Sequence, residues 1–106
     1  MQLEKFKDFI KDKADDLKAN DITELDLREK STFTEYMLVC SGNSKQHVKS
    51  IARHVADEAK QEQIRPYGIE GEDVGEWVLV DFGEVVLHVM TEEMRDLYQL
   101  EKLWQQ

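Results

Sequence analysis

The stretch 77-WVLVDFGEVVLHVM-90 carries four side chains that could do chemistry, Trp77, Asp81, Glu84 and His88, between two apolar runs. An imidazole beside a carboxylate can act as a general base, and two carboxylates can hold Mg²⁺. Aromatic side chains bordered by charges also form protein-docking surfaces. Three interpretations therefore compete for this stretch: a catalytic site, a binding face, and the ordinary edge of a core.

Catalytic motifs elsewhere in the chain give the first interpretation little support. Ser41, His88 and Asp81 could be combined as a hydrolase triad, but the chain has no G-x-S-x-G motif. Asp81 and Glu84 could hold Mg²⁺ in a nucleotidyltransferase-like site, yet no D-x-D motif accompanies a phosphate loop. We therefore predict no catalytic residues and no cofactor.

Two further segments could bind a small ligand. The segment 41-SGNSKQH-47 leads from a strand into a helix, where free amides can hold phosphate, but it matches neither G-x-x-x-x-G-K-[ST] nor G-x-G-x-x-G, so we predict a capped helix start. His47 and His54 lie seven residues apart, with Glu58 one turn beyond His54. Helical metal pairs usually lie four residues apart, and we predict no metal site.

Length and charge narrow the class of protein. The 106 residues are enough for one compact domain over 1–106, and the net charge of −9 disfavours direct nucleic-acid binding and favours a basic protein partner. Acidity that serves solubility alone is the alternative. Cys40 stands alone in an apolar run, which favours a small buried side chain. The segment 1–13 lacks the apolar centre of a signal peptide and no run approaches membrane-spanning length, so we expect a cytoplasmic protein.

Hydrophobic periodicity predicts an α+β fold, a mixed β-sheet with packing helices. The patterns predict, in order, an amphipathic helix of about 16 residues at the start, a short strand at 20–27, a loop at 28–35, a strand at 36–42, a helix at 43–63, a short strand within 64–76, a hairpin at 77–90 and a helix at 91–106. The strand at 36–42, the long helix and a later strand could form one right-handed crossover. Both hairpin strands are nearly continuous in apolar residues, so we expect both of their faces to be covered.

The hairpin register decides which side chains share a face. A turn centred on Phe82 and Gly83 would pair Asp81 with Glu84 and Trp77 with His88. One face would then be aliphatic, with Val78, Val80, Val85, Leu87 and Val89. The other would carry Trp77, Leu79, Asp81, Glu84, Val86, His88 and Met90, which is the composition of a docking surface.

Taken together, four segments resemble the bacterial ribosomal silencing factor family, RsfS, also called Iojap-like. They are 36-YMLVCSGNSKQHVKSIA-52, 69-IEGE-72, 77-WVLVDFGEVVLHVM-90 and 95-RDLYQLEKLW-104, in the family's order and over nearly the whole chain. The resemblance implies a fold similar to nucleotidyltransferases without their catalytic carboxylates. It also implies binding to the large ribosomal subunit through the basic ribosomal protein L-fourteen, which would block small-subunit joining and lower translation when nutrients are limiting.

The resemblance turns the binding face into a specific expectation. The expected docking residues are Glu70, Trp77, Leu79, Asp81, Glu84, His88, Met90 and Tyr98. Trp104 is expected to pack against the core or within a homodimer. Two other functions stay open: a nucleotidyltransferase-like enzyme acting on a nucleotide, and a general acidic module for basic proteins.

Overall fold

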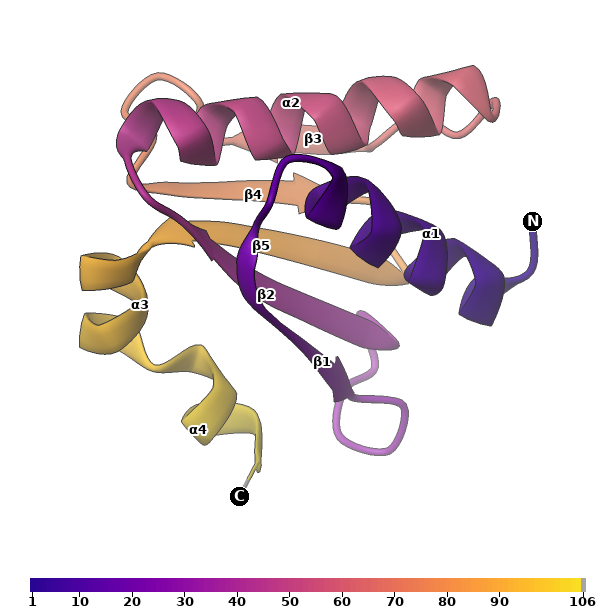
Figure 1. Cartoon of the computed structure of the whole chain (residues 1–106). Helices are drawn as coiled ribbons and strands as arrows, with labels where there is room; N and C mark the ends of the chain where they lie inside the picture. Colours follow the sequence, from indigo (N-terminus) through magenta and orange to yellow (C-terminus); the bar gives the residue numbers. More distant parts are fainter. Residues whose placement is uncertain (106) are drawn as a thin grey trace.

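The computed structural model describes residues 1–105 and contains five strands and four helices (Figure 1). In chain order they are α1 (Leu3–Asp16), β1 (Asn20–Asp26), β2 (Tyr36–Gly42), α2 (Lys45–Gln61), β3 (Gly68–Glu70), β4 (Trp77–Asp81), β5 (Val85–Thr91), α3 (Glu92–Tyr98) and α4 (Leu100–Gln105). The predicted α+β order is confirmed up to the last helix, which is divided in two.

All five strands form one mixed sheet in the order β1-β2-β5-β4-β3. The pair β2 and β5 is parallel, and the other three pairs are antiparallel. The chain therefore leaves β2 through α2, adds β3 and β4 at the edge, and returns beside β2 as β5. This confirms the predicted crossover connection between the 36–42 strand and a later parallel strand.

Helices α1 and α2 cover one face of this sheet, which holds the main core (Figure 1). The apolar stripe of α2, including Ile51 and Val55, packs against the aliphatic hairpin face that contains Val80 and Leu87. Cys40 lies in the same core, and burial raises the pKa of its thiol to about 12. The aliphatic set and the buried cysteine were both predicted, because strand alternation sends every second side chain to one face.

The opposite face carries a smaller core under the C-terminal helices. Its buried members are Leu25, Leu27, Met37, Val39 and Met90, with Trp77, Met94, Leu100 and Trp104 partly buried against them. Helix α3 packs on β5 and β2, and α4 packs on β1. Every second residue of β4 is left half-exposed, and so is Val86 near the start of β5. The expectation that both faces of both hairpin strands are covered is therefore wrong for β4 and for Val86, and correct for Leu87 to Met90 of β5.

The predicted helix at 91–106 begins as expected and then breaks. Thr91 caps α3 by accepting a hydrogen bond from the Met94 amide at 3.4 Å. Gln99 adopts φ 50°, in the left-handed region, and separates α3 from α4. Because a left-handed residue turns the chain, α4 can lie over β1 instead of continuing away from the sheet.

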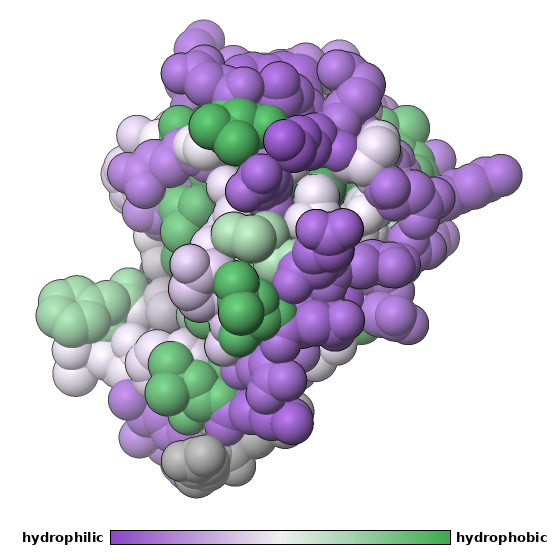
Figure 2. All heavy atoms as spheres, turned by 90° about the vertical axis from the view of Figure 1, so that its left-hand side faces the viewer, coloured by the Kyte–Doolittle hydropathy of each residue, from purple (hydrophilic) through white to green (hydrophobic). Residues whose placement is uncertain are grey.

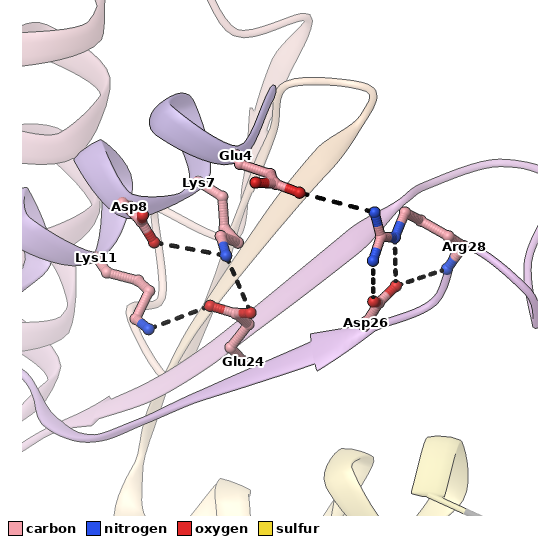
Figure 3. A network of polar contacts seen from close by, with 7 residues as sticks. All are labelled: Glu4, Lys7, Asp8, Lys11, Glu24, Asp26 and Arg28. Carbon is pink, nitrogen blue, oxygen red and sulfur yellow. Dashed lines mark hydrogen bonds and ion pairs between the residues drawn. The ribbon is translucent and has the colours of Figure 1, made fainter. Parts of the chain in front are cut away.

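Ion pairs fasten α1 to the edge strand β1 (Figure 3). Lys7 and Lys11 converge on Glu24 of β1, each at 3.1 Å. Arg28, just after β1, contacts Asp26 at 2.6 Å and Glu4 of α1 at 3.9 Å. The pairs of Arg28 are largely exposed and contribute little stability individually, whereas the Lys7 and Glu24 side chains are only 13% and 28% exposed. The Lys7–Glu24 pair and the apolar contacts of α1 therefore do most to hold the helix.

The hairpin turn is longer than predicted, and its register differs by two residues. Trp77 pairs with Met90, Leu79 with His88 and Asp81 with Val86, so the predicted pairs of Trp77 with His88 and Asp81 with Glu84 are wrong. The Phe82 amide donates to the Val85 carbonyl at 2.9 Å across the turn. A two-residue change conserves strand alternation, and both predicted faces therefore keep their members.

Candidate functional site: the open face of the sheet

The half-exposed side of β4 forms the centre of a continuous surface across three strands. Strand pairing aligns His88, Leu79 and Glu70 across β5, β4 and β3. Directly paired residues point to the same face, and the next row places Val86 beside Asp81. Six of the eight predicted docking residues are therefore on one face of the sheet: Glu70, Trp77, Leu79, Asp81, His88 and Met90.

Tyr98 joins this surface from α3. Its ring lies 4.9 Å from the Trp77 ring, centroid to centroid, at an interplanar angle of 49°. Tyr98 is 52% exposed, whereas Trp77 is half-buried beneath it. Paired aromatic rings of this geometry offer a large rigid contact area to a partner.

His88 supports Trp77 from inside the sheet. The Trp77 indole N–H donates to His88 Nδ1 at 2.9 Å, so this nitrogen must be unprotonated and the imidazole acts as an acceptor. Burial lowers the pKa of His88 to about 4, which keeps the ring neutral near pH 7. His88 therefore orients the indole and is too deeply buried to offer much surface of its own.

Met90 does not belong to the surface. Its side chain is fully buried at 0% exposure in the core beneath α3. Alternation placed it correctly on the Trp77 face, but α3 folds back over that end of β5 and covers it. The prediction of Met90 as a docking residue is corrected to a core residue.

Carboxylates border the open face in two different ways. The Asp81 carboxylate accepts from the Gly83 amide at 2.7 Å and so stabilises the hairpin turn. The Glu84 side chain is exposed, while its backbone carbonyl accepts from the amides of Glu35 and Tyr36. Glu70 is exposed on the edge strand β3. Asp81 and Glu70 thus lie on the open face, whereas Glu84 lies in the hairpin turn and lines a hollow with Leu3 and Phe6 of α1.

Helices α3 and α4 add apolar side chains that the sequence reasoning did not assign to the site. Leu97 and Leu103 are both mostly exposed. Figure 2 shows the side of the molecule on which α3 lies, with several separate hydrophobic patches next to a hydrophilic area. The spacing of the apolar residues predicted a broad apolar surface on one continuous helix, which includes Leu97 and Leu103, but the break at Gln99 decides which of them point outward.

The residues considered for catalysis are not brought together. Ser41 Oγ lies 3.5 Å from the Asn20 carbonyl and 3.4 Å from Arg95, whereas His88 bonds to Trp77 and Asp81 to Gly83. A hydrolase triad needs these groups hydrogen-bonded to one another. This arrangement gives no nucleophile an adjacent base.

The start of α2 borders a cleft of about 350 Å³. Ser44 Oγ accepts from the His47 amide at 3.1 Å, which confirms the predicted helix cap. Glu76, Glu92 and Glu93 also line the cleft. Lys45 lines the cleft too and pairs with Glu76 at 3.3 Å, but Glu92 and Glu93 leave a net negative charge that repels a phosphate, so the cleft is poorly suited to a nucleotide.

The histidines of α2 are occupied by other groups. His47 accepts from the Asn43 amide at Nδ1 (2.8 Å), and its Nε2 lies 2.7 Å from the Leu17 carbonyl. His54 Nε2 lies 3.0 Å from Asp16. Within residues 1–105, no group of three or more His, Cys, Asp or Glu side chains gathers in a way that could hold a metal ion. No helix in that range is long and apolar enough to cross a membrane.

Known proteins resemble this chain over almost its whole length. The family model described as "Ribosomal silencing factor during starvation", RsfS, matches residues 2–106. Ribosomal silencing factor RsfS of Haemophilus influenzae is 37% identical over 97 residues, covering 92% of this chain and 95% of the relative. The Bacillus subtilis protein of the same name is 46% identical over 90 residues, covering 85% and 76%.

A eukaryotic relative and a solved structure extend the comparison. The mouse protein named "Mitochondrial assembly of ribosomal large subunit protein 1" is 37% identical over 89 residues, covering 81% of this chain and 39% of the relative. A crystal structure of a Chromobacterium violaceum protein superposes with a TM-score of 0.96 at 38% identity, covering 98% of this chain and 87% of that one. The family's named role is regulatory rather than catalytic, and it supports translational repression at the ribosome. The chain belongs to the RsfS family of ribosomal silencing factors.

Proposed function

We propose that this protein represses translation in the cytoplasm by binding the large ribosomal subunit through the basic ribosomal protein L-fourteen. The bound protein would occupy the surface on which the small subunit lands, so that the two subunits could not join. Family membership supports action at the ribosome, and the name of the mouse relative points to the large subunit. The single observation that carries the docking site is the Trp77–Tyr98 ring pair, half open to solvent and bordered by carboxylates.

The proposed contact surface consists of the site side chains that solvent can reach. Trp77, Leu79 and Tyr98 supply the apolar centre, Asp81 and Glu70 supply the acidic border, and Glu84 would extend this border from the hairpin turn. Lysine and arginine side chains of a basic protein complement such a border, while the apolar centre supplies most of the affinity. His88 contributes by holding the indole in place.

Sedimentation of mixtures with purified ribosomal particles tests the proposal. We expect the protein to co-sediment with free large subunits and not with intact ribosomes, because its site would be covered in the joined particle. In a second measurement, small subunits are added to large subunits already saturated with the protein. We expect fewer joined ribosomes than with large subunits alone. Equal recovery on both particles would contradict the occlusion mechanism.

Two parts of the resemblance are included in the proposal. The fold is proposed to be similar to that of nucleotidyltransferases. The alternative function, an enzyme acting on a nucleotide, is tested by titrating the protein with a nucleotide and Mg²⁺. Saturable nucleotide binding would favour the enzyme. Self-association as a homodimer is also proposed, since Leu97 and Leu103 are apolar and exposed beside the docking surface. Analytical ultracentrifugation over a range of protein concentrations tests it.

A further inference from the structure

Helix α3, which carries Tyr98, has unusually little apolar anchorage. It has seven residues and none of them is fully buried. Met94 is partly buried against the smaller core, and Leu97 points into solvent. A helix of this length is not stable by itself in water, so its position must come from specific contacts with the rest of the molecule.

Arg95 makes most of the polar contacts that could supply this anchorage. Its guanidinium donates to Thr23 Oγ1 at 3.0 Å and to the Asn20 carbonyl at 3.3 Å, both in β1. It also contacts Ser41 Oγ in β2 at 3.4 Å and Glu101 in α4 at 3.2 Å. One side chain thus joins α3 to two strands and to the next helix.

The surroundings of Arg95 make these contacts more effective than an ordinary surface pair. Its side chain is 12% exposed and that of Glu101 is 22% exposed. Charged hydrogen bonds are stronger where water is largely excluded, and the planar guanidinium can satisfy several acceptors at once in fixed directions. The Arg95–Glu101 pair also spans the break at Gln99, so it sets the angle between α3 and α4.

Tyr98 lies one helical turn after Arg95. Residues three apart on a helix are neighbours on its surface, so movement of the Arg95 anchor moves the Tyr98 ring. The Gln99 amide donates to the Arg95 carbonyl at 2.9 Å and closes the turn between them. The contact of the Tyr98 ring with the Trp77 ring, 4.9 Å between centroids, therefore depends on where Arg95 is held.

We propose that Arg95 is a positioning residue for the docking surface: its bonds to β1, β2 and α4 fasten α3 and thereby hold the Tyr98 ring on Trp77. Arg95 acts through Tyr98 and does not itself contact the partner. This inference rests on the proposed docking function.

The variant Arg95→Met tests the inference, with Arg28→Met as the matched control. Arg28 also donates two hydrogen bonds to a carboxylate, that of Asp26, but it lies over the Tyr36 ring on the α1 side of the sheet. We expect Arg95→Met to lose the nuclear Overhauser contact between the Trp77 and Tyr98 rings and to bind purified large subunits about tenfold more weakly, a typical loss for a displaced anchor. Arg28→Met should keep the ring contact and bind like the parent protein.

The change in net charge alone predicts the opposite effect on affinity, namely tighter binding. Both variants make a chain of formal charge −9 more negative by one unit, which strengthens long-range attraction to a basic partner. Weaker binding by Arg95→Met therefore reports the lost position of Tyr98. An unchanged ring contact together with parental affinity would overturn the inference.

A double-mutant cycle separates positioning from direct contact. In a Tyr98→Ala background, Arg95→Met should cause little further loss of affinity, because the ring that it positions is already absent. Fully additive losses would overturn the indirect role. If Arg95→Met does not fold, Glu101→Gln removes the charge of the bridge to α4 and leaves the other Arg95 contacts. We then expect a weaker nuclear Overhauser contact between the Trp77 and Tyr98 rings, a measurement that does not depend on net charge; an unchanged ring contact would refute the inference.

The ring contact also distinguishes the two proposals. If the parent protein does not bind large subunits, the docking function fails, while the nuclear Overhauser measurement on Arg95→Met still decides whether Arg95 positions Tyr98.

Discussion

At the scale of single residues, Trp77 and Tyr98 have different surroundings although they touch. Trp77 packs partly on the smaller core and donates to His88, so Trp77→Ala would disturb the fold as well as any interface. Tyr98 is half-exposed and its described ring contact is with Trp77. Tyr98 is therefore the better residue for measuring docking.

We expect Tyr98→Ala to bind large subunits at least about tenfold more weakly, since aromatic anchors at interfaces commonly lose about 2 kcal/mol on truncation. The midpoint of denaturant unfolding should change little, because half of the side chain is already in water. Tyr67→Ala is the matched control: Tyr67 is 84% exposed and lies against Gly83, beyond the open face. Parental affinity of Tyr98→Ala would remove Tyr98 from the docking surface.

His88 makes stability depend on pH. Its folded-state pKa is lowered by burial from 6.5 to about 4, so between these values the unfolded chain binds the proton and the folded chain does not. Stability is therefore fully present above pH 6.5 and is lost as pH falls toward 4, at a slope of up to about 1.4 kcal/mol per pH unit.

The variant His88→Gln measures this contribution, because a glutamine oxygen can still accept from the Trp77 indole. We expect the variant to have a shallower fall in unfolding free energy between pH 6.5 and 5 than the parent, measured by urea denaturation at each pH. Identical slopes would show that His88 is not neutral in the folded protein.

At the scale of elements, the segment between β3 and β4 delivers Trp77 to the open face. Gly71 has φ 90°, and a Cβ placed there would lie 2.1 Å from the Trp77 carbonyl oxygen. Glu72 and Glu76 of the same segment pair with Arg53 and Lys45 of α2. Two ion pairs to α2 thus hold this loop immediately before β4, the strand that presents the Trp77 indole.

Gly71→Ala should therefore lower the unfolding free energy by more than about 2 kcal/mol, because both the positive φ and a backbone contact oppose the new methyl group. Gly68→Ala provides the matched control, since a Cβ at Gly68 would meet nothing within 4 Å. Thermal melts of the two variants test the difference. Equal melting temperatures would mean that the loop rearranges freely.

At the scale of the whole molecule, the acidic surface should set the rate of association with a basic partner. Rim charges mainly alter the association rate and its salt dependence. Glu84 is exposed in the hairpin turn that follows Asp81, and Glu62 is exposed beyond the end of α2.

We expect Glu84→Gln to slow association with large subunits at low salt by about twofold to fivefold, with the difference reduced as salt screens the charges. Glu62→Gln makes the same change of net charge away from the open face and should have a smaller effect. Stopped-flow measurements at several salt concentrations compare the two. Equal effects of both variants would show that net charge matters and the location of Glu84 does not.

The sequence by itself determined the elements as far as Thr91 and the division of the hairpin into two faces. Val78, Val80, Leu87 and Val89 alternate with Trp77 and its neighbours, and a period of two survives any even change of register. The spacing of the motifs was also enough to identify the family, because the residues around Trp77, His88 and Tyr98 occur in a specific order over nearly the whole chain.

The tertiary structure alone decided which members of the predicted face reach solvent. Met90 and Leu79 follow the same alternation, yet α3 covers Met90 and leaves Leu79 half-exposed. Coverage depends on where the chain turns at Gln99 and on the bonds of Arg95 to β1 and β2, which lie far away in sequence. Periodicity is a local property of the chain, whereas burial depends on contacts between distant segments, so the accessible surface could not be deduced from alternation.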